Sequence, residues 1–391
     1  SKIIIKGESS MIPYNQKIVK VQTSKIRQFN DYTKEVGADV ILTLGEPDFY
    51  TPEEITEAAI KALHEHQTKY GPTPGFMEVR AKVCEYEKRV NNYFCTPDEV
   101  IITHGSTEAL TSALFTMINE GDEVVVLNPT YPMYRQMVEF MGGNLVTIDT
   151  TVTNFQVTKE QLINAITPKT KAIILTSPNN PTGSVLNDSS YEVIYQAIKD
   201  KPIYVICDDV YNQIIFENRK PGFVRYTDLK ERIIVCQSFS KSYAMPGWRC
   251  GYMIANKEFV SHAVKIHQYM IVALNTFIQP AMIKALDYDS QDMVQSYKKR
   301  RDYIYERLVQ MGLEVEKPEG AFYIFPSIKK YNVSSFEFCK RFAQKYKVAI
   351  IPGDCFEADD FIRISYCVDF DTIKTACDRL ELFLKELENE K

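Results

Sequence analysis

The sequence has no uninterrupted hydrophobic run long enough to span a membrane. A span needs about 20 predominantly apolar residues. The longest apolar stretch, residues 267–286, is interrupted by His267, Gln268, Asn275, Gln279 and Lys284. We predict a long, largely buried helix there. The apolar triplet at residues 3–5 lies between lysines and is too short for the core of a signal peptide, which favours a cytoplasmic protein.

Two cysteine patterns are also missing. None of the nine cysteines forms a CxxC pair, and no cysteine–histidine cluster has the spacing of a zinc site. Several cysteines lie in apolar, strand-like runs, such as Cys207 in IYVIC and Cys236 in RIIVC. We therefore expect buried, reduced thiols and no bound metal, in agreement with a cytoplasmic protein.

Charge of one sign is not in large excess. Lysine and arginine total 46 against 51 aspartates and glutamates, a net charge of -5, which provides no general attraction to nucleic acid or to anionic membranes. The sequence contains neither GxGxxG nor GxxxxGK[ST], so we predict neither a dinucleotide site nor an NTP site. It has no internal repeat and no flexible Gly/Ser linker, so we expect closely packed domains with a shared cleft.

Short runs rich in valine and isoleucine alternate with helical patterns through most of the chain. These runs are uniformly apolar, as in strands that are buried on both faces. Residues 107–119 and 192–199 have helical spacing of their apolar positions. The alternation predicts a mostly parallel sheet with helices on both faces. The predicted strands are residues 100–103, 123–127, 171–176, 203–207, 232–236 and 250–254.

The last hundred residues have a different pattern. A charged helix at 291–312 ends at Gly312, a residue that often terminates helices. Strand-like AFYIF, a helix at 335–346, strand-like VAII and FIRIS, and a charged terminal helix follow. This order is typical of an α+β region and predicts a second, smaller domain.

A lysine in SFSKSYAMPGWRCGY, residues 238–252, is a candidate nucleophile. Taken alone, Lys241 would be interpreted as a surface residue, but the segment follows a buried-looking strand, and open α/β sheets form their sites at the carboxyl ends of strands. Partial desolvation lowers the pKa of a lysine and makes its amine reactive. Ser238, Ser240 and Arg249 can donate hydrogen bonds to a phosphate dianion.

Three further strand ends carry polar residues. Asn180 follows a predicted strand in the turn SPNNPTG. Asp208 follows another, with Tyr211 three residues later; its carboxylate is either a solvated loop acid or a group that keeps a cofactor nitrogen protonated. The third strand runs through the turn Gly105-Ser106-Thr107 into a helix, which is either an ordinary connection or an anion site at the helix N-terminus.

The four elements follow one another along the chain as the Gly105 turn, the Asn180 turn, Asp208 with Tyr211, and Lys241 with Arg249. Together, and in this chain order, they resemble the fold-type I, class I/II aminotransferases, which depend on pyridoxal 5′-phosphate (PLP). The resemblance extends from LGEPDF at residues 44–49 to FIRISY at residues 361–366. The segments KYGPTPGFMEVR and NPTYPMY also look like family segments. KIHQYM, YKKRRDYIYERL and GAFYIFPSIKK look most like the bacterial branch of aromatic and N-acetyl-diaminopimelate aminotransferases.

The resemblance implies a role for each residue of the predicted PLP site. Lys241 would hold PLP as a Schiff base and then act as general base, and Asp208 would pair with the pyridinium nitrogen. Asn180 and Tyr211 would bind the 3′ oxygen, and Tyr131, unless it is only a core aromatic, would stack on the ring. The phosphate would be held by Gly105, Ser106, Thr107, Ser238, Ser240 and Arg249, with Ser240 as the weaker member.

The resemblance also implies a substrate site. Arg363 would bind the α-carboxylate bidentately together with Asn180 and the backbone of Gly45. An arginine in an apolar strand needs an anionic partner, either a substrate or a structural salt bridge. Tyr70 would reach the phosphate in a partner subunit, which implies a homodimer with shared active sites. Thr107 replaces a lysine that binds the distal carboxylate in some aspartate-using relatives, so strict aspartate specificity is not expected.

The implied architecture is an α/β fold of two domains. Residues 45–285 would form the large PLP domain, on a mixed, mostly parallel, seven-stranded sheet. Residues 1–44 with 286–391 would form a small α+β domain that closes over the substrate. The implied reaction, in amino acid metabolism and biosynthesis, moves an amino group from an aromatic amino acid, glutamate or an N-acetyl-diaminopimelate-like donor to a 2-oxo acid, with 2-oxoglutarate as the default acceptor.

Two other activities remain open. A PLP-dependent carbon–sulfur β-lyase would use the same lysine, aspartate and arginine, so the sequence separates it poorly from an aminotransferase. A non-catalytic module that senses PLP or an amino acid is disfavoured. Such modules carry a fused helix-turn-helix DNA-binding domain, whereas this acidic sequence starts almost at the enzyme fold.

Overall fold

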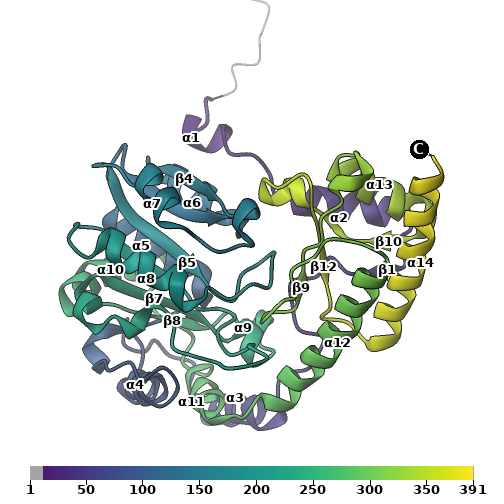
Figure 1. Cartoon of the computed structure of the whole chain (residues 1–391). Helices are drawn as coiled ribbons and strands as arrows, with labels where there is room; N and C mark the ends of the chain where they lie inside the picture. The colour runs from purple at the N-terminus through teal and green to yellow at the C-terminus, as the bar shows by residue number, and fades with distance from the viewer. Residues whose placement is uncertain (1–11, 391) are drawn as a thin grey trace, which may run out of the picture.

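A computed structural model describes residues 12–390, which form two lobes (Figure 1). The large lobe contains the elements from α3 (Glu53–His64) to α11 (Gln279–Asp287). The small lobe contains α2 (Lys25–Glu35), β1 (Val40–Ile41) and the elements from α12 (Gln291–Gln310) to α14 (Phe370–Asn389). A short helix, α1 (Gln16–Val19), precedes α2.

The large lobe is built on a seven-stranded sheet with the strand order β2-β8-β7-β6-β5-β3-β4. β8 is antiparallel to both of its neighbours, and the other neighbouring pairs are parallel. The predicted α/β fold with a mixed, mostly parallel sheet is therefore confirmed. The strands are β2 (Val100–Thr103), β3 (Glu123–Asn128), β4 (Asn144–Asp149), β5 (Thr170–Thr176), β6 (Tyr204–Asp208), β7 (Ile233–Ser238) and β8 (Gly251–Ile254).

Each of the six predicted strands is present with its ends shifted by at most two residues. Their continuous apolar runs reflect burial on both faces, which is complete along β2, β7 and β8. The sequence did not predict β4, because this edge strand is largely solvent-accessible and its sequence, NLVTID, is mixed in polarity. In a sequence, a strand that is buried on both faces is easier to recognise, from its continuous apolar run, than a half-exposed edge strand.

Helices cover both faces of this sheet, as predicted. Val124 and Val126 of β3 share a hydrophobic cluster with Leu114 of α5, whereas Val125 shares a cluster with Ile194 of α8. Successive strand residues point to opposite faces, so each face has its own core. The helices of this lobe between α3 and α11 are α4 (Met77–Asn91), α5 (Gly105–Met117), α6 (Met133–Phe140), α7 (Lys159–Ala165), α8 (Asp188–Ile198), α9 (Phe239–Ser242) and α10 (Lys257–Ile271).

The prediction of one long helix over residues 267–286 is wrong. α10 ends at Ile271, Val272 has a φ of 67°, and α11 begins at Gln279. Pro280 lies in the first turn of α11 and has no N–H to continue a helix from the preceding turn. The segment between the two helices is held next to residues 67–69, because the Thr276 hydroxyl donates to the carbonyls of residues 67 and 69 at 2.8 and 3.0 Å.

The small lobe brings the N-terminal and C-terminal parts of the chain together. Phe29 and Leu42 belong to the same hydrophobic cluster as Phe338 and Phe383. The cluster also includes Phe155 and Tyr211 of the large lobe, and the domain division at residues 45 and 285 stays a prediction. The remaining elements of this lobe are β9 (Tyr323–Ile324), α13 (Ser335–Tyr346), β10 (Val348–Ala349), β11 (Ile351–Pro352) and β12 (Ile362–Ser365).

The strand-like run VAII forms two short strands rather than one. β10 pairs with β1 in a parallel two-stranded sheet, and β11 pairs with β12 in an antiparallel sheet that also contains β9. The run is divided because its two halves pair with different partners. β12 carries Arg363 to the boundary between the lobes.

All nine cysteines are free. Seven are buried, as expected, whereas Cys84 and Cys95 are half-buried, with their Sγ atoms 3.2 Å apart. Within residues 12–390, no helix combines the length and the apolar character that crossing a bilayer requires.

Candidate active site

A cavity of about 370 Å³ lies where the carboxyl ends of the large-sheet strands meet the small lobe. Its walls come from both lobes, and twelve of the residues predicted from the sequence contribute to them. Residues that are up to 318 positions apart therefore meet around one space. These twelve are Gly45, Ser106, Thr107, Tyr131, Asn180, Asp208, Tyr211, Ser238, Ser240, Lys241, Arg249 and Arg363.

Lys241 lies on α9, which begins immediately after β7. The Ser238 hydroxyl caps this helix by accepting a hydrogen bond from the backbone N–H of Ser240 at 3.0 Å. The Lys241 Nζ donates to the carbonyl oxygen of Gly45. Burial lowers the pKa of Lys241 to about 8, because a desolvated ammonium is disfavoured relative to the neutral amine. The uncharged form of Lys241, a nucleophile or base, is thus a minor but accessible species near neutral pH.

Asp208 is the last residue of β6 and faces the same cavity. Its Oδ2 accepts a hydrogen bond from the Tyr134 hydroxyl, whereas its Oδ1 is buried and has no hydrogen-bond partner among the described residues. Burial raises the pKa of Asp208 to about 6. The solvated-loop interpretation of this carboxylate is therefore wrong, since its side chain is buried. A buried oxygen without a partner is suited to a ligand that donates a proton or carries positive charge.

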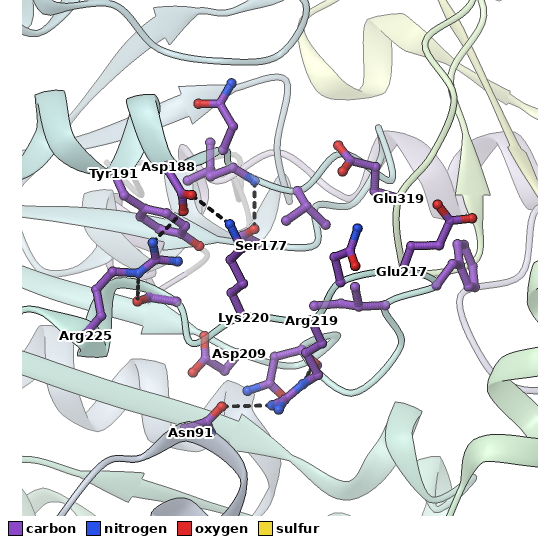
Figure 2. Close-up of a pocket in the computed structure, with 18 of the residues that line it drawn as sticks. Asn91, Ser177, Asp188, Tyr191, Asp209, Glu217, Arg219, Lys220, Arg225 and Glu319 are labelled. Atoms are coloured by element: carbon purple, nitrogen blue, oxygen red, sulfur yellow. Dashed lines mark hydrogen bonds and ion pairs between the residues drawn. The ribbon is translucent and has the colours of Figure 1, made fainter.

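The neighbouring Asp209 faces a different space. It lines a second cavity of about 270 Å³ together with Asn91, Arg219 and Lys220 (Figure 2). Successive residues at the end of a strand point to opposite sides, and this alternation assigns Asp208 alone to the cavity that contains Lys241. Burial raises the pKa of Asp209 to about 8.

Arg363 on β12 is a buried cation with neutral partners only. Its Nη1 donates to Asn180 Oδ1 at 2.9 Å and its Nη2 to the carbonyl of Thr43 at 2.8 Å, while Nε has no partner among the described residues. Its guanidinium stacks on the Tyr323 ring at 4.6 Å. Within residues 12–390, no carboxylate lies within ion-pair distance of Arg363. The arrangement therefore suits an anionic ligand better than a structural salt bridge.

Arg249 and the N-terminus of α5, which were predicted to bind a phosphate, lie together at another part of the cavity. The Arg249 Nη1 lies 3.5 Å from Ser240 Oγ and 3.0 Å from the carbonyl of Pro246. Gly105, the first residue of α5, is not in the cavity wall, but it has a φ of 75°, and a Cβ there would lie 3.0 Å from Arg249 Nη2. The glycine therefore leaves room for the guanidinium beside the free N–H groups of the first helical turn.

Two tyrosines of the cavity contact other tyrosines that were not predicted as site residues. The Tyr211 hydroxyl lies 2.7 Å from that of Tyr323, and the Tyr131 ring contacts that of Tyr134 edge-on at 5.6 Å between centroids. Tyr134 and Tyr323 were missed as site residues. Tyr134 lies one helical turn after Tyr131 in NPTYPMY, and that spacing is the only local signal that it shares the same face.

Tyr70 is not brought to the other predicted residues. Its side chain is 89% exposed and takes no part in the cavity wall. Its predicted contact is with a second copy of the chain, so its role stays a prediction.

Comparison with known proteins shows the family of the chain. The model of the family "Aminotransferase class I and II" matches residues 39–380. The chain is 36% identical over 376 residues to the probable N-acetyl-LL-diaminopimelate aminotransferase of Bacillus subtilis, with 95% of both chains covered. It is 35% identical over 382 residues to aromatic-amino-acid aminotransferase 2 of Thermococcus litoralis, with 95% of this chain and 98% of that one covered.

A solved structure supports the same conclusion. The double mutant of aspartate aminotransferase from Thermus thermophilus superposes with a TM-score of 0.91 at 32% identity, over 95% of this chain and 100% of that one. The chain therefore belongs to the class I and II aminotransferases, enzymes that use pyridoxal 5′-phosphate to move an amino group between an amino acid and a 2-oxo acid.

Proposed function

We propose that the 370 Å³ cavity is the catalytic site and that Lys241 both holds the cofactor and moves the substrate proton. One observation carries this proposal. A lysine of lowered pKa, a buried carboxylate with one unpartnered oxygen and an arginine without a carboxylate partner all face the same space. These are the groups that an amino acid and a cofactor with a basic ring nitrogen require.

The residues of the cavity fit PLP. Asp208 Oδ1 needs a donor, and a protonated pyridine nitrogen is one. Asn180 Oδ1 is occupied by Arg363, which leaves its Nδ2 to donate to the 3′ oxygen next to Tyr211. Arg249 and Ser238, with the first turn of α5 at Ser106 and Thr107 and with the weaker donor Ser240, would hold the phosphate, and Tyr131 would cover one ring face.

Each residue of the site then has its own role in the reaction. PLP supplies an electron sink for the electron pair that the substrate α-carbon releases. Arg363 orients the α-carboxylate, with the backbone of Gly45 beside it, and Lys241 Nζ takes the α-proton. A lysine with a pKa of about 8 is suited to this task because its neutral form is accessible at physiological pH. Closure of the small domain, residues 1–44 with 286–391, would exclude water.

The finer assignments follow the family. We propose aromatic amino acids, glutamate or N-acetyl-diaminopimelate-like compounds as amino donors and 2-oxoglutarate as the acceptor, in amino acid biosynthesis in the cytoplasm. We also propose a homodimer in which Tyr70 reaches the phosphate of the partner subunit. Its exposed ring in a single chain supports this role, since an exposed tyrosine has contact area to offer.

The decisive experiment is a half-reaction titration of the purified holoenzyme. Single amino acids are added without an acceptor, and the visible absorption of the bound cofactor is followed together with the keto acid released. Loss of the absorption with stoichiometric keto acid is expected. Persistent absorption with pyruvate and ammonia from a sulfur amino acid would instead identify a carbon–sulfur β-lyase.

Three variants test the assignment of residues. Lys241→Ala is expected to abolish turnover and the yellow colour. Asp208→Asn is expected to lose most of kcat, whereas Asp209→Asn, a matched change on the other side of the strand end, is expected to retain it. Equal effects of the two aspartate variants would contradict the role of Asp208.

A further inference from the structure

Two thiols, those of Cys84 and Cys95, lie side by side in the large lobe. Their Sγ atoms are 3.2 Å apart, and the Cys95 thiol donates to Cys84 Sγ. Both side chains are half-buried, whereas the other seven cysteines are buried. Among residues 12–390, no other two cysteine sulfurs are in hydrogen-bond contact. A reagent in solution therefore reaches these two thiols together, and more readily than any other cysteine of the chain.

The local backbone holds the two thiols next to each other. Cys84 lies midway along α4, on the outside of the large lobe (Figure 1), and Cys95 lies in the segment that connects α4 with β2. Asn92 ends the helix with a φ of 50°, a left-handed conformation that reverses the chain. The returning segment is bound to the helix, because Arg80 Nη1 donates to the carbonyl of Pro97 at 2.9 Å. The position of both sulfurs is thus set by a helix and its anchored exit.

We propose that Cys84 and Cys95 form a reversible disulfide when the enzyme meets a low-molecular-weight disulfide, for which oxidised glutathione is the probe. A disulfide bond is about 2.05 Å long, so the two sulfurs must approach each other by about 1 Å. Rotation of two half-buried side chains achieves a shift of this size without moving the core. Neither residue lines the catalytic cavity, so the inference is independent of the proposed function.

The hydrogen bond between the thiols determines which sulfur reacts first. The Cys95 thiol donates to Cys84, and this bond lowers the pKa of Cys84 below its ordinary value. The thiolate is the nucleophile in thiol–disulfide exchange. Cys84 is therefore the attacking residue and Cys95 the resolving one.

The exchange proceeds in two steps. In the first, the Cys84 thiolate attacks one sulfur of glutathione disulfide, whose S–S bond breaks, and one glutathione thiolate leaves. In the second, Cys95 loses its proton to solvent, and its sulfur attacks Cys84 Sγ and displaces the other glutathione thiolate. Two protein thiols are oxidised, one glutathione disulfide is reduced to two glutathione thiols, and the two thiol protons end on these.

The new bond would join parts of the chain that other contacts already hold in place. The backbone N–H of Thr96 donates to Glu99 Oε2 at 2.8 Å, and Lys230 Nζ lies 3.1 Å from Glu99 Oε1. On β2, the backbone N–H of Ile102 donates to the carbonyl of Pro74 at 2.9 Å. These bonds do not involve the sulfurs, so β2 keeps its place when the disulfide closes. We expect an oxidised enzyme that stays active and is more resistant to unfolding, because the cross-link restricts the unfolded chain.

Mass spectrometry of the holoenzyme after incubation with oxidised glutathione tests the disulfide. The natural protein is expected to lose the mass of two hydrogen atoms and to yield a cross-link between the peptides of Cys84 and Cys95, which a reducing agent reverses. Cys95→Ser is expected to stop at the mixed disulfide and to gain the mass of one glutathione. Cys84→Ser should react about threefold or more slowly than Cys95→Ser, because the remaining thiol has the higher pKa. Cys377→Ala, which removes a buried cysteine outside the pair, is the matched control and should form the disulfide like the natural protein.

A natural protein that keeps all nine thiols would overturn the inference. So would a mixed disulfide that persists on the natural protein as it does on Cys95→Ser, because the two sulfurs would then not meet. The midpoint of thermal unfolding is expected to rise by a few degrees on oxidation of the natural protein and to stay unchanged in Cys95→Ser. Equal midpoints of the oxidised and reduced natural protein, or a loss of transfer activity on oxidation, would contradict a disulfide that closes without moving β2.

Discussion

Replacing Tyr134 by phenylalanine is expected to raise the pKa of Asp208. The Tyr134 hydroxyl is the one side-chain donor to this carboxylate among the described residues, and both side chains are buried. A hydrogen bond to a charged group is worth about 1.5–3 kcal/mol, and about 1.4 kcal/mol corresponds to one pKa unit. The substitution should therefore move the pKa of Asp208 from about 6 upward by about one to two units.

The sign of the effect on cofactor binding follows directly. A pyridinium nitrogen is attracted by the ionised form of Asp208, so binding weakens as the pH falls through the pKa of Asp208. The suitable probe is pyridoxamine 5′-phosphate, because its amine does not condense with Lys241. Binding to the apoenzyme between pH 5 and 9 can be followed through Trp248, the single tryptophan, which adjoins Arg249 of the cavity.

The expected result is an acid limb of pyridoxamine 5′-phosphate binding that lies about one to two pH units higher in Tyr134→Phe than in the natural protein. Inorganic phosphate, which has no ring nitrogen, should show the same pH profile in both. Tyr195→Phe, which removes a surface tyrosine that donates to Asp228 at 2.7 Å, is the matched control. Coincident acid limbs in Tyr134→Phe and the natural protein would refute the reasoning.

Three other predictions concern separate parts of the site. Arg363→Ala should reduce kcat/KM about 10- to 150-fold for every amino donor, measured across a panel with different side chains; a loss confined to one donor would make Arg363 a specificity residue. Burial lowers the pKa of Lys241 to about 8, so covalent capture of PLP by the apoenzyme should accelerate as the pH rises towards 8 and level off above it. Stopped-flow absorbance would show this, and continued acceleration to pH 10 would contradict it. Gly105→Ala should weaken inorganic phosphate binding about tenfold or more, because the new methyl group displaces Arg249. Gly121→Ala is the control, since Gly121 has a similar positive φ but open space around it, and equal calorimetric affinities of the two variants would exclude the steric explanation.

The sequence by itself determined the sheet and the order of the chemical groups along it. Runs of valine and isoleucine mark strands that are buried on both faces, and this signal is local, since each run is four to seven residues long. Because parallel strands end at one edge, polar residues after several strands had to meet there. Asn180, Asp208 and Lys241 were predicted together for this reason, and they line one cavity.

Only the tertiary structure decided which side chains complete that cavity. Tyr134 reaches Asp208 across 74 positions, and Arg135 reaches Glu357 across 222. Residue spacing along a strand or helix carries no information about such contacts. The division of VAII into two strands has the same origin, because distant pairing partners outweigh local propensity there. Strand ends can be recognised from neighbouring residues, whereas the packing of one lobe against the other depends on the whole chain.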